Sequence, residues 1–245
     1  MATWIVHLRI AERLLSELPG LDDAAFALGN IAPDSVIPDE KWEHFDPPPR
    51  VTHFQIEDHP LFRSADLRFF RENLSPLRDA KPDPALFSMR LGYFFHLITD
   101  NLWYQQVGRP AWERWRAEFS NDSAFWEEIK GDWYGLDHAY VRAHPDSLFW
   151  RVFVHCRYER DDLPFLPAAA VQRQMTYIQN WYRSDDAEIR AKLARPFNYL
   201  SQVKVDGFVE EACEKLKRIH QLVWLNHPEL DGRVSALELL TEFRP

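Results

Sequence analysis

A histidine and an aspartate lie four residues apart in a stretch that is otherwise almost entirely apolar. His96 and Asp100 belong to residues 91–103, which read LGYFFHLITDNLW. A helix that is apolar on all sides belongs in a protein interior, and residues four apart share one helical face. An ionised carboxylate in such a place is costly unless a cation or strong hydrogen-bond donors compensate it. The pair therefore predicts either a metal site or a hydrogen-bonded His–Asp pair in the core.

Two histidines and an aspartate in other apolar segments favour the metal. His7 lies in an N-terminal amphipathic segment, Asp34 ends the segment FALGNIAPD, and His53 lies in the segment VTHF. Zinc accepts imidazole and carboxylate ligands, and sites with several metal ions often share an aspartate. Together with His96 and Asp100, these residues predict a zinc cluster.

The elements that must position these residues are mainly helices. Thr3 is a plausible N-cap for a first helix, whose apolar stripe turns His7 inward. Asp34 and His53 fall in residues 29–60, a long segment that we expect to be mostly loop and functional. The central helix is expected over residues 84–106. Its Gly92, one turn before His96, leaves room either for close approach at the site or for simple helix packing. Further helical segments are expected at 24–28, 60–73, 110–130, 148–160, 168–183, 187–194 and 206–225, the last with Asp206 as N-cap.

Composition favours a globular all-α protein. The chain has 245 residues and only eight glycines, with neither a domain linker nor an internal repeat, so we expect a single multi-helix domain over residues 1–245. The net charge of -9 gives no general attraction to nucleic acid. Two cysteines, Cys156 and Cys213, suit buried reduced thiols rather than a disulfide framework. Without a signal-like N-terminus or a membrane-length apolar run, the sequence predicts a cytoplasmic protein with no integral membrane association.

The order of these segments resembles the zinc-dependent phospholipase C family. That family includes the bacterial phosphatidylcholine-hydrolysing enzymes and uncharacterised cytosolic relatives. The resemblance covers roughly the first 105 residues, from His7 through GNIAPD and THF to GYFFHLITD. It implies an all-helical fold with one to three zinc ions. By the resemblance His53, His96 and Asp34 would hold one zinc, Asp100 would join two zincs, and His7 would hold another.

The match departs from the secreted lipases of the family in three places. Their mature N-terminal Trp binds zinc through its amino group, whereas Trp4 is internal here. Gln106 stands where they carry a further histidine, and their later HxxxE pair corresponds at best to the distant His155 and Glu159. These two residues form either a ligand pair or an ordinary helical pair. Asp132, in KGDWYGLD, is a further metal-ligand candidate whose alternative role is a helix N-cap.

Two functions of different kinds fit these residues. The first is a zinc-dependent phosphoric ester hydrolase that uses metal-activated water on a small-molecule or lipid phosphoester. By the resemblance Asp34 would also orient the attacking water and act as general base. The alternative is a non-catalytic helical protein with a structural or vestigial metal site.

Overall fold

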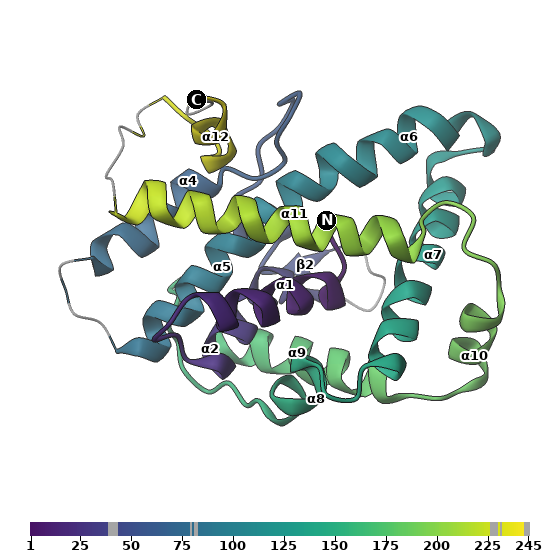
Figure 1. Ribbon diagram of the computed structural model, residues 1–245, viewed down its shortest axis with the longest axis horizontal. Helices are drawn as coiled ribbons and strands as arrows, with labels where there is room; N and C mark the ends of the chain where they lie inside the picture. The colour runs from purple at the N-terminus through teal and green to yellow at the C-terminus, as the bar shows by residue number, and fades with distance from the viewer. Residues whose placement is uncertain (39–43, 79, 81–82, 226–229, 231, 243–245) are drawn as a thin grey trace.

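The helix that carries His96 and Asp100 runs through the middle of the molecule. A computed structural model describes residues 1–38, 44–78, 80, 83–225, 230 and 232–242, and Figure 1 shows the other helices around α5 (Pro84–Trp103). Pro84 stands in the first turn, and Asp83 caps the helix by accepting a hydrogen bond from the Ala85 amide at 3.3 Å. The helix is buried along most of its length and continues into a π turn, Tyr104–Gly108. The central helix expected from the sequence is confirmed.

The N-terminal helix α1 (Trp4–Glu17) lies beside α11 (Gln202–His220) at the other end of the chain. Thr3 occupies the N-cap position of α1, but its hydroxyl donates to Asp137 at 2.7 Å instead of capping the helix. The apolar stripe of α1 packs into the core and buries His7 completely, as the stripe predicts.

Two glycines let α2 (Asp23–Gly29) approach α5 with the two backbones in contact. A Cβ atom at Gly92 would lie 2.5 Å from the Phe26 carbonyl oxygen and 3.0 Å from the Asn30 nitrogen. A Cβ atom at Gly29 would lie 2.1 Å from the carbonyl oxygen of Met89. Gly92 therefore serves close helix packing, and this packing brings Asn30 next to His96.

The segment between α2 and α4 (Asp66–Phe69) has more structure than the expected loop. It holds the 3-10 turn η1 (Ala32–Asp34), the antiparallel strands β1 (Ile37–Pro38) and β2 (Phe45–Asp46), and α3 (Pro49–Thr52). Part of the expected loop, residues 39–43, lies outside the described residues. Asp34 and His53 each lie at or just beyond the end of a short helical element, which fixes their backbones.

Three expected helix bounds are wrong, and the helical segment expected over 110–130 is interrupted at residues 119–121, after which its second helix continues to residue 143. Residues 60–65 are not helical, because Asn101 receives hydrogen bonds from the amides of Arg63 and Ser64 at 2.7 and 3.1 Å. The helix expected over 148–160 stops at Arg151, and after a 3-10 turn the Tyr158 amide donates to the side chain of Gln172. The N-cap of α11 is Ser201, so Asp206 lies inside that helix and pairs with Arg9.

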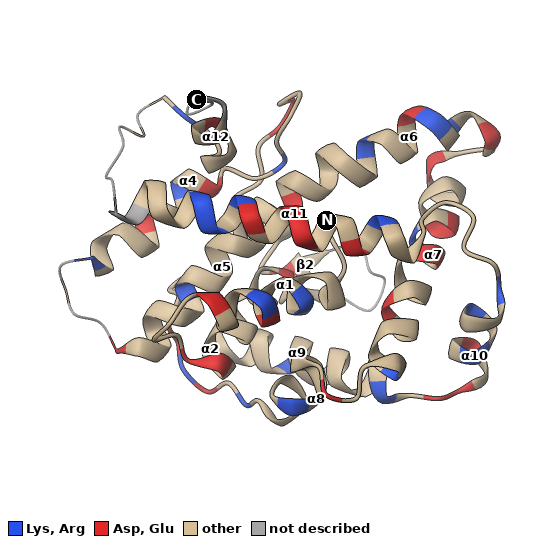
Figure 2. Ribbon diagram, viewed as in Figure 1, with Lys and Arg blue, Asp and Glu red and all other residues tan. Residues whose placement is uncertain are grey.

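The remaining helices surround this centre, and together they confirm the all-α class. Apolar residues from α1, α5, α7 (Asp122–Ala143), α9 (Ala168–Arg183) and α11 join one core. Both cysteines are free and buried. Acidic and basic residues alternate along the outer face of α11 (Figure 2). Within the described residues, no helix is long and apolar enough to span a membrane. The other described helices are α6 (Arg109–Trp115), α8 (Leu148–Arg151), α10 (Ala187–Ala194) and α12 (Leu239–Glu242). Short 3-10 or π turns are Phe70–Leu74, Ser75–Leu77, Arg116–Glu118, Phe153–His155, Gln221–Leu225 and Ala236–Glu238.

Candidate metal centre

The five residues that the sequence singles out as a cluster converge in the core. Asp100 lies at the centre, with one oxygen 3.4 Å from Nε2 of His7 and the other 3.4 Å from Nε2 of His96. The imidazole rings of His7 and His96 stack with their centroids 3.9 Å apart. His53 closes the group, with its Nε2 3.1 Å from Asp34 and 3.7 Å from Asp100. Four elements far apart in the sequence thus deliver their polar side chains to one place.

The cluster divides into two overlapping sets of three ligands. His7, His96 and Asp100 form one set, and Asp34, His53 and His96 form the other. Within each set the candidate ligand atoms lie within 4.8 Å of one another, and all five residues are buried. This donor set of imidazoles and carboxylates suits zinc, and His96 and Asp100 lie where the two sets meet.

Several atoms of the cluster have no hydrogen-bond partner, although they are fully buried. They are both ring nitrogens of His7, Nε2 of His96 and Oδ2 of Asp100. Leaving buried polar atoms without a partner is unfavourable, by about 1–3 kcal/mol for each group. A metal ion provides the missing partner for lone pairs on imidazole and carboxylate alike. The residues present therefore fit zinc better than they fit a hydrogen-bonded His–Asp network.

Neighbouring groups fix the orientation of the ligands. Nδ1 of His96 lies 2.8 Å from the Asn30 carbonyl oxygen, so it donates its proton there and leaves a lone pair on Nε2. Nδ1 of His53 lies 3.1 Å from the hydroxyl of Thr52. Oδ1 of Asp100 accepts a hydrogen bond from the Ala2 amide at 2.7 Å. These contacts direct the free lone pairs toward the centre of the cluster.

The electrostatics of the cluster prepare most of its ligands for a metal. Burial lowers the pKa of His7 to about 4, and repulsion from His96 lowers it as well. Burial acts to raise the pKa values of Asp34 and Asp100, but the charge of His96 and contacts with other neighbouring groups together outweigh it, and both pKa values lie below their ordinary range. Burial also acts to lower the pKa of His96, but Asp100 and Asp34 outweigh it and the net shift is upward. At neutral pH, His7 is thus neutral and both aspartates are ionised, as metal binding requires, whereas His96 binds its proton more tightly than an ordinary histidine.

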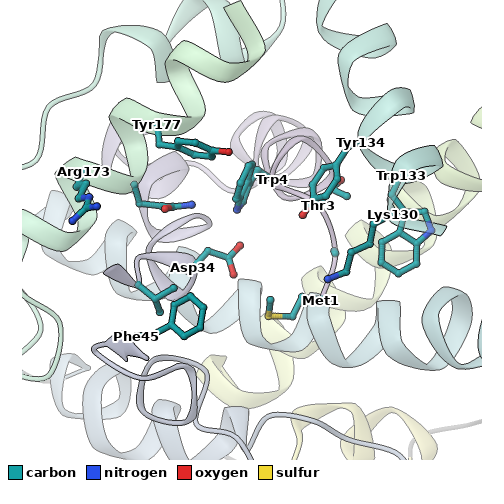
Figure 3. A pocket seen from close by; sticks show the side chains of 13 residues that line it. Met1, Thr3, Trp4, Asp34, Phe45, Lys130, Trp133, Tyr134, Arg173 and Tyr177 are labelled. Carbon is teal, nitrogen blue, oxygen red and sulfur yellow. The ribbon is translucent and has the colours of Figure 1, made fainter. Parts of the chain in front are cut away.

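The cluster opens to solvent through a cavity of about 400 Å³. The cavity lies between the start of α1, the segment after η1, α7 and α9 (Figure 3). Among the five cluster residues, only Asp34 lines it, between Trp4 and Phe45. Lys130 and Arg173 lie on either side of Asp34 in this view. The cavity gives a small molecule a route to the cluster, and Asp34 is the residue it would meet.

Asp132 does not join the cluster. It lies within α7 and is not an N-cap either. Its two oxygens accept hydrogen bonds from Arg195 at 2.8 Å and from the Tyr199 amide at 2.6 Å. Because this carboxylate is already compensated by a cation and an amide, it has a structural role that its sequence context does not reveal.

The other candidates for completing the cluster also lie apart from it. His155 and Glu159 are both exposed, and neither belongs to a potential metal-binding group within the described part of the chain. Gln106 donates to Glu211 on the surface at 2.8 Å. Within the described residues, potential metal-binding groups of three or more side chains are limited to the two sets of the cluster.

Sequence reasoning missed four residues that contribute to the site. Asn30 orients His96 through a backbone carbonyl, and the Ala2 amide binds Asp100. The only signal for Asn30 was its position in GNIAPD, four residues before Asp34. The cations Lys130 and Arg173 gave no signal at all, because only the folding of α7 and α9 brings them to one cavity.

An all-helical fold around a buried cluster of histidines and aspartates defines a metal-binding protein of the zinc type. The family model described as zinc dependent phospholipase C matches residues 6–161, and the chain belongs to this family. The matched region contains all five cluster residues and extends well beyond the first 105 residues. No curated protein and no solved structure shows a significant match to the chain.

Proposed function

We propose that this protein is a zinc-dependent hydrolase of phosphoesters. Membership of the zinc-dependent phospholipase C family and the five-residue cluster together support a zinc-dependent hydrolase. The phosphoester substrate, small-molecule or lipid, and the expected cytoplasmic location are our own inferences. Zinc, when bound, lowers the pKa of a water ligand toward neutrality and neutralises charge on phosphate oxygens.

The position of Asp34 is the observation that carries the proposal. A purely structural metal site needs no access, whereas Asp34 belongs to the cluster and also lines the cavity. Its carboxylate is 8% exposed, compared with 2% for Asp100. A water molecule and a phosphate that enter the cavity would therefore meet Asp34 before any other cluster residue. This accessibility favours catalysis over a structural or vestigial site.

The five cluster residues would have different roles in the reaction. His7, His53, His96 and Asp100 would hold the metal, each deep enough to exclude bulk water. Asp34 would also bind the metal, orient the attacking water and accept its proton through a carboxylate oxygen. Nε2 of His53 lies 3.1 Å from that carboxylate, so the two side chains would meet at the same metal ion. Burial acts to raise the pKa of Asp34, but contacts with the neighbouring histidines hold it below its ordinary range, so the carboxylate is ionised at neutral pH.

Parallel assays of four proteins test the proposal. We expect the zinc-loaded wild type to hydrolyse a chromogenic phosphodiester, bis(p-nitrophenyl) phosphate, and chelator to remove that activity. Asp34→Asn should lower turnover by about a hundredfold or more, since a positioned base contributes roughly that factor. The same variant should keep more of its zinc than of its activity. His53→Ala should lose both zinc and activity.

The control is Asp185→Asn, which removes an exposed acid outside the cluster. It should retain both zinc and turnover. Equal residual rates in wild type, Asp34→Asn and His53→Ala would show that the measured activity is a contaminant. In that case a zinc-binding but catalytically inactive helical protein would be the better interpretation.

A further inference from the structure

Two cations line the cavity without an acidic partner among the described residues. Lys130 on α7 and Arg173 on α9 both line the cavity, and both are exposed. Neither forms an ion pair with another described residue. Many other cations of the chain are paired, such as Lys217 with Glu17 and Glu214, and Arg195 with Asp132. The positive charge at the mouth is thus left for something that enters the cavity.

The residues that the structure describes around the cavity offer little to a positively charged group. Asp34 is the one acid among the described residues that line it, and its oxygen is already 3.1 Å from His53. Aromatic faces can attract a quaternary ammonium group. Here, however, Trp4 packs against Tyr134 and Tyr177, with ring centroids 5.9 Å apart in each pair. An ammonium group would find these rings partly covered by one another and two fixed positive charges nearby.

We propose that the cavity selects phosphoesters that carry a further negative charge next to the scissile phosphate, with Lys130 and Arg173 as the residues that recognise it. This inference rests on the proposed phosphoesterase function. The cluster would bind the scissile phosphate beside Asp34, and the two cations would bind the second anionic group nearer the mouth. A cationic choline headgroup would be disfavoured there. A cavity of about 400 Å³ accommodates a phosphate together with a small organic group.

A series of three small phosphomonoesters isolates the charge of the attached group. Phosphocholine carries a positive group, glycerol 3-phosphate a neutral one and 3-phosphoglycerate a carboxylate. Calorimetric titration of the zinc-loaded wild type should give affinities that rise in this order. Raising the salt concentration should compress the differences, because exposed charges are screened. Equal affinities, or tightest binding of phosphocholine, would overturn the inference.

Charge-removing variants test the two residues directly. Lys130→Gln and Arg173→Gln should each weaken binding of 3-phosphoglycerate by about fivefold, the factor for one charge pair near contact in a high-dielectric setting. Binding of phosphocholine should be unchanged or slightly tighter. Arg183→Gln serves as the matched control, since Arg183 is an exposed cation on the same helix as Arg173 but does not line the cavity. Retention of the wild-type preference in the Lys130→Gln/Arg173→Gln double variant would refute the assignment.

The same measurements separate failure of this inference from failure of the proposed function. Zinc content should be unchanged in all these variants, because neither cation belongs to the cluster. Zinc-dependent turnover without charge selectivity would retain the function and discard the inference. If none of the three ligands binds and no phosphoester is hydrolysed, both fall together.

Two substrates with the same headgroup distinguish a lipid source from a soluble one. Dioctanoyl phosphatidylinositol 4-phosphate and glycerophosphoinositol 4-phosphate both carry an additional phosphate beside the scissile one and differ in their acyl chains. Hydrolysis of either substrate in preference to its uncharged-headgroup analogue, without the additional phosphate, supports the inference. Hydrolysis of only the first identifies the substrate as a lipid. No preference for the additional phosphate in either pair contradicts the inference.

Discussion

Gly92 offers a test of how the packing of two helices controls the metal centre. In Gly92→Ala the added methyl group would lie 2.5 Å from the Phe26 carbonyl oxygen and 3.0 Å from the Asn30 nitrogen. Carbon and oxygen atoms in ordinary contact are about 3.5 Å apart, so α2 and α5 have to separate by close to 1 Å at this point. Both nearby groups are backbone atoms, so rotation of a side chain cannot relieve the clash.

The displacement reaches the metal centre through a single hydrogen bond. Asn30 follows the C-terminus of α2, and its carbonyl oxygen lies 2.8 Å from Nδ1 of His96. A movement of close to 1 Å would break this bond and free the ring of His96 to rotate. Loss of a group that orients a metal ligand typically costs about 10–100-fold in metal affinity, and we expect a loss of that size.

Stability should fall as well, for a separable reason. Overpacking typically costs about 1–3 kcal/mol, and alanine's better helix propensity offsets up to about 1 kcal/mol of this. Urea unfolding of the metal-free protein measures this effect, and competition with a chromogenic chelator measures zinc affinity. Gly207→Ala is the control, because Gly207 is an exposed residue of α11 with no atom within 4 Å of its added Cβ. It should stabilise the protein by about 0.5–1 kcal/mol and leave zinc affinity unchanged.

Two outcomes would refute this reasoning. A Gly92→Ala protein with the urea midpoint and the zinc affinity of the wild type would show that α2 and α5 are not in the contact described. Lower stability with full zinc affinity would show that the Asn30 carbonyl does not control His96.

Three other predictions concern zinc, Asp132 and pH. Zinc at several hundred times its Kd contributes roughly 3–4 kcal/mol to stability, because it binds the native state alone. Verified removal of the zinc should therefore lower the melting temperature by about 10 °C. An unchanged melting temperature would favour a purely structural His–Asp network. Asp132→Asn should leave zinc content intact but lower the unfolding free energy by about 1–3 kcal/mol, because it weakens the hydrogen bond to Arg195. Loss of zinc in this variant would show that Asp132 is a metal ligand. Burial raises the pKa of Asp66 to about 7, although bonds from Ser235, the Ala236 amide and Asn101 act to lower it. The folded protein thus holds this proton more tightly than the unfolded chain does. The stabilisation from Asp66 is complete below about pH 4 and is lost as pH rises through 7. The unfolding free energy of the wild type relative to that of Asp66→Asn should therefore fall by about 2–3 kcal/mol from pH 5 to pH 8. The same pH dependence of the unfolding free energy in both proteins would contradict this prediction.

The sequence by itself determined the helical class, the central helix and the identity of the cluster. The spacing of His96 and Asp100 is a local property, since residues four apart share a face in any α-helix. An inward-facing His7 likewise follows from the apolar stripe of its own helix. Polar residues in apolar segments are costly to bury, so their presence in the sequence is enough to mark a site.

The tertiary structure alone decided which polar residues meet and how they are oriented. The sequence indicated Asp132 as a further ligand, yet Arg195, more than sixty residues away in the chain, donates a hydrogen bond to its carboxylate. The helix expected from residue 60 fails because Asn101 binds the backbone of Arg63 and Ser64. The local periodicity of the sequence does not indicate such distant partners. The same holds for the cavity, where Lys130 and Arg173 come together only because α7 and α9 pack beside the N-terminus. Contacts between distant segments depend on the packing of whole helices. That packing determines both the access from solvent to the metal centre and the charge at the cavity entrance.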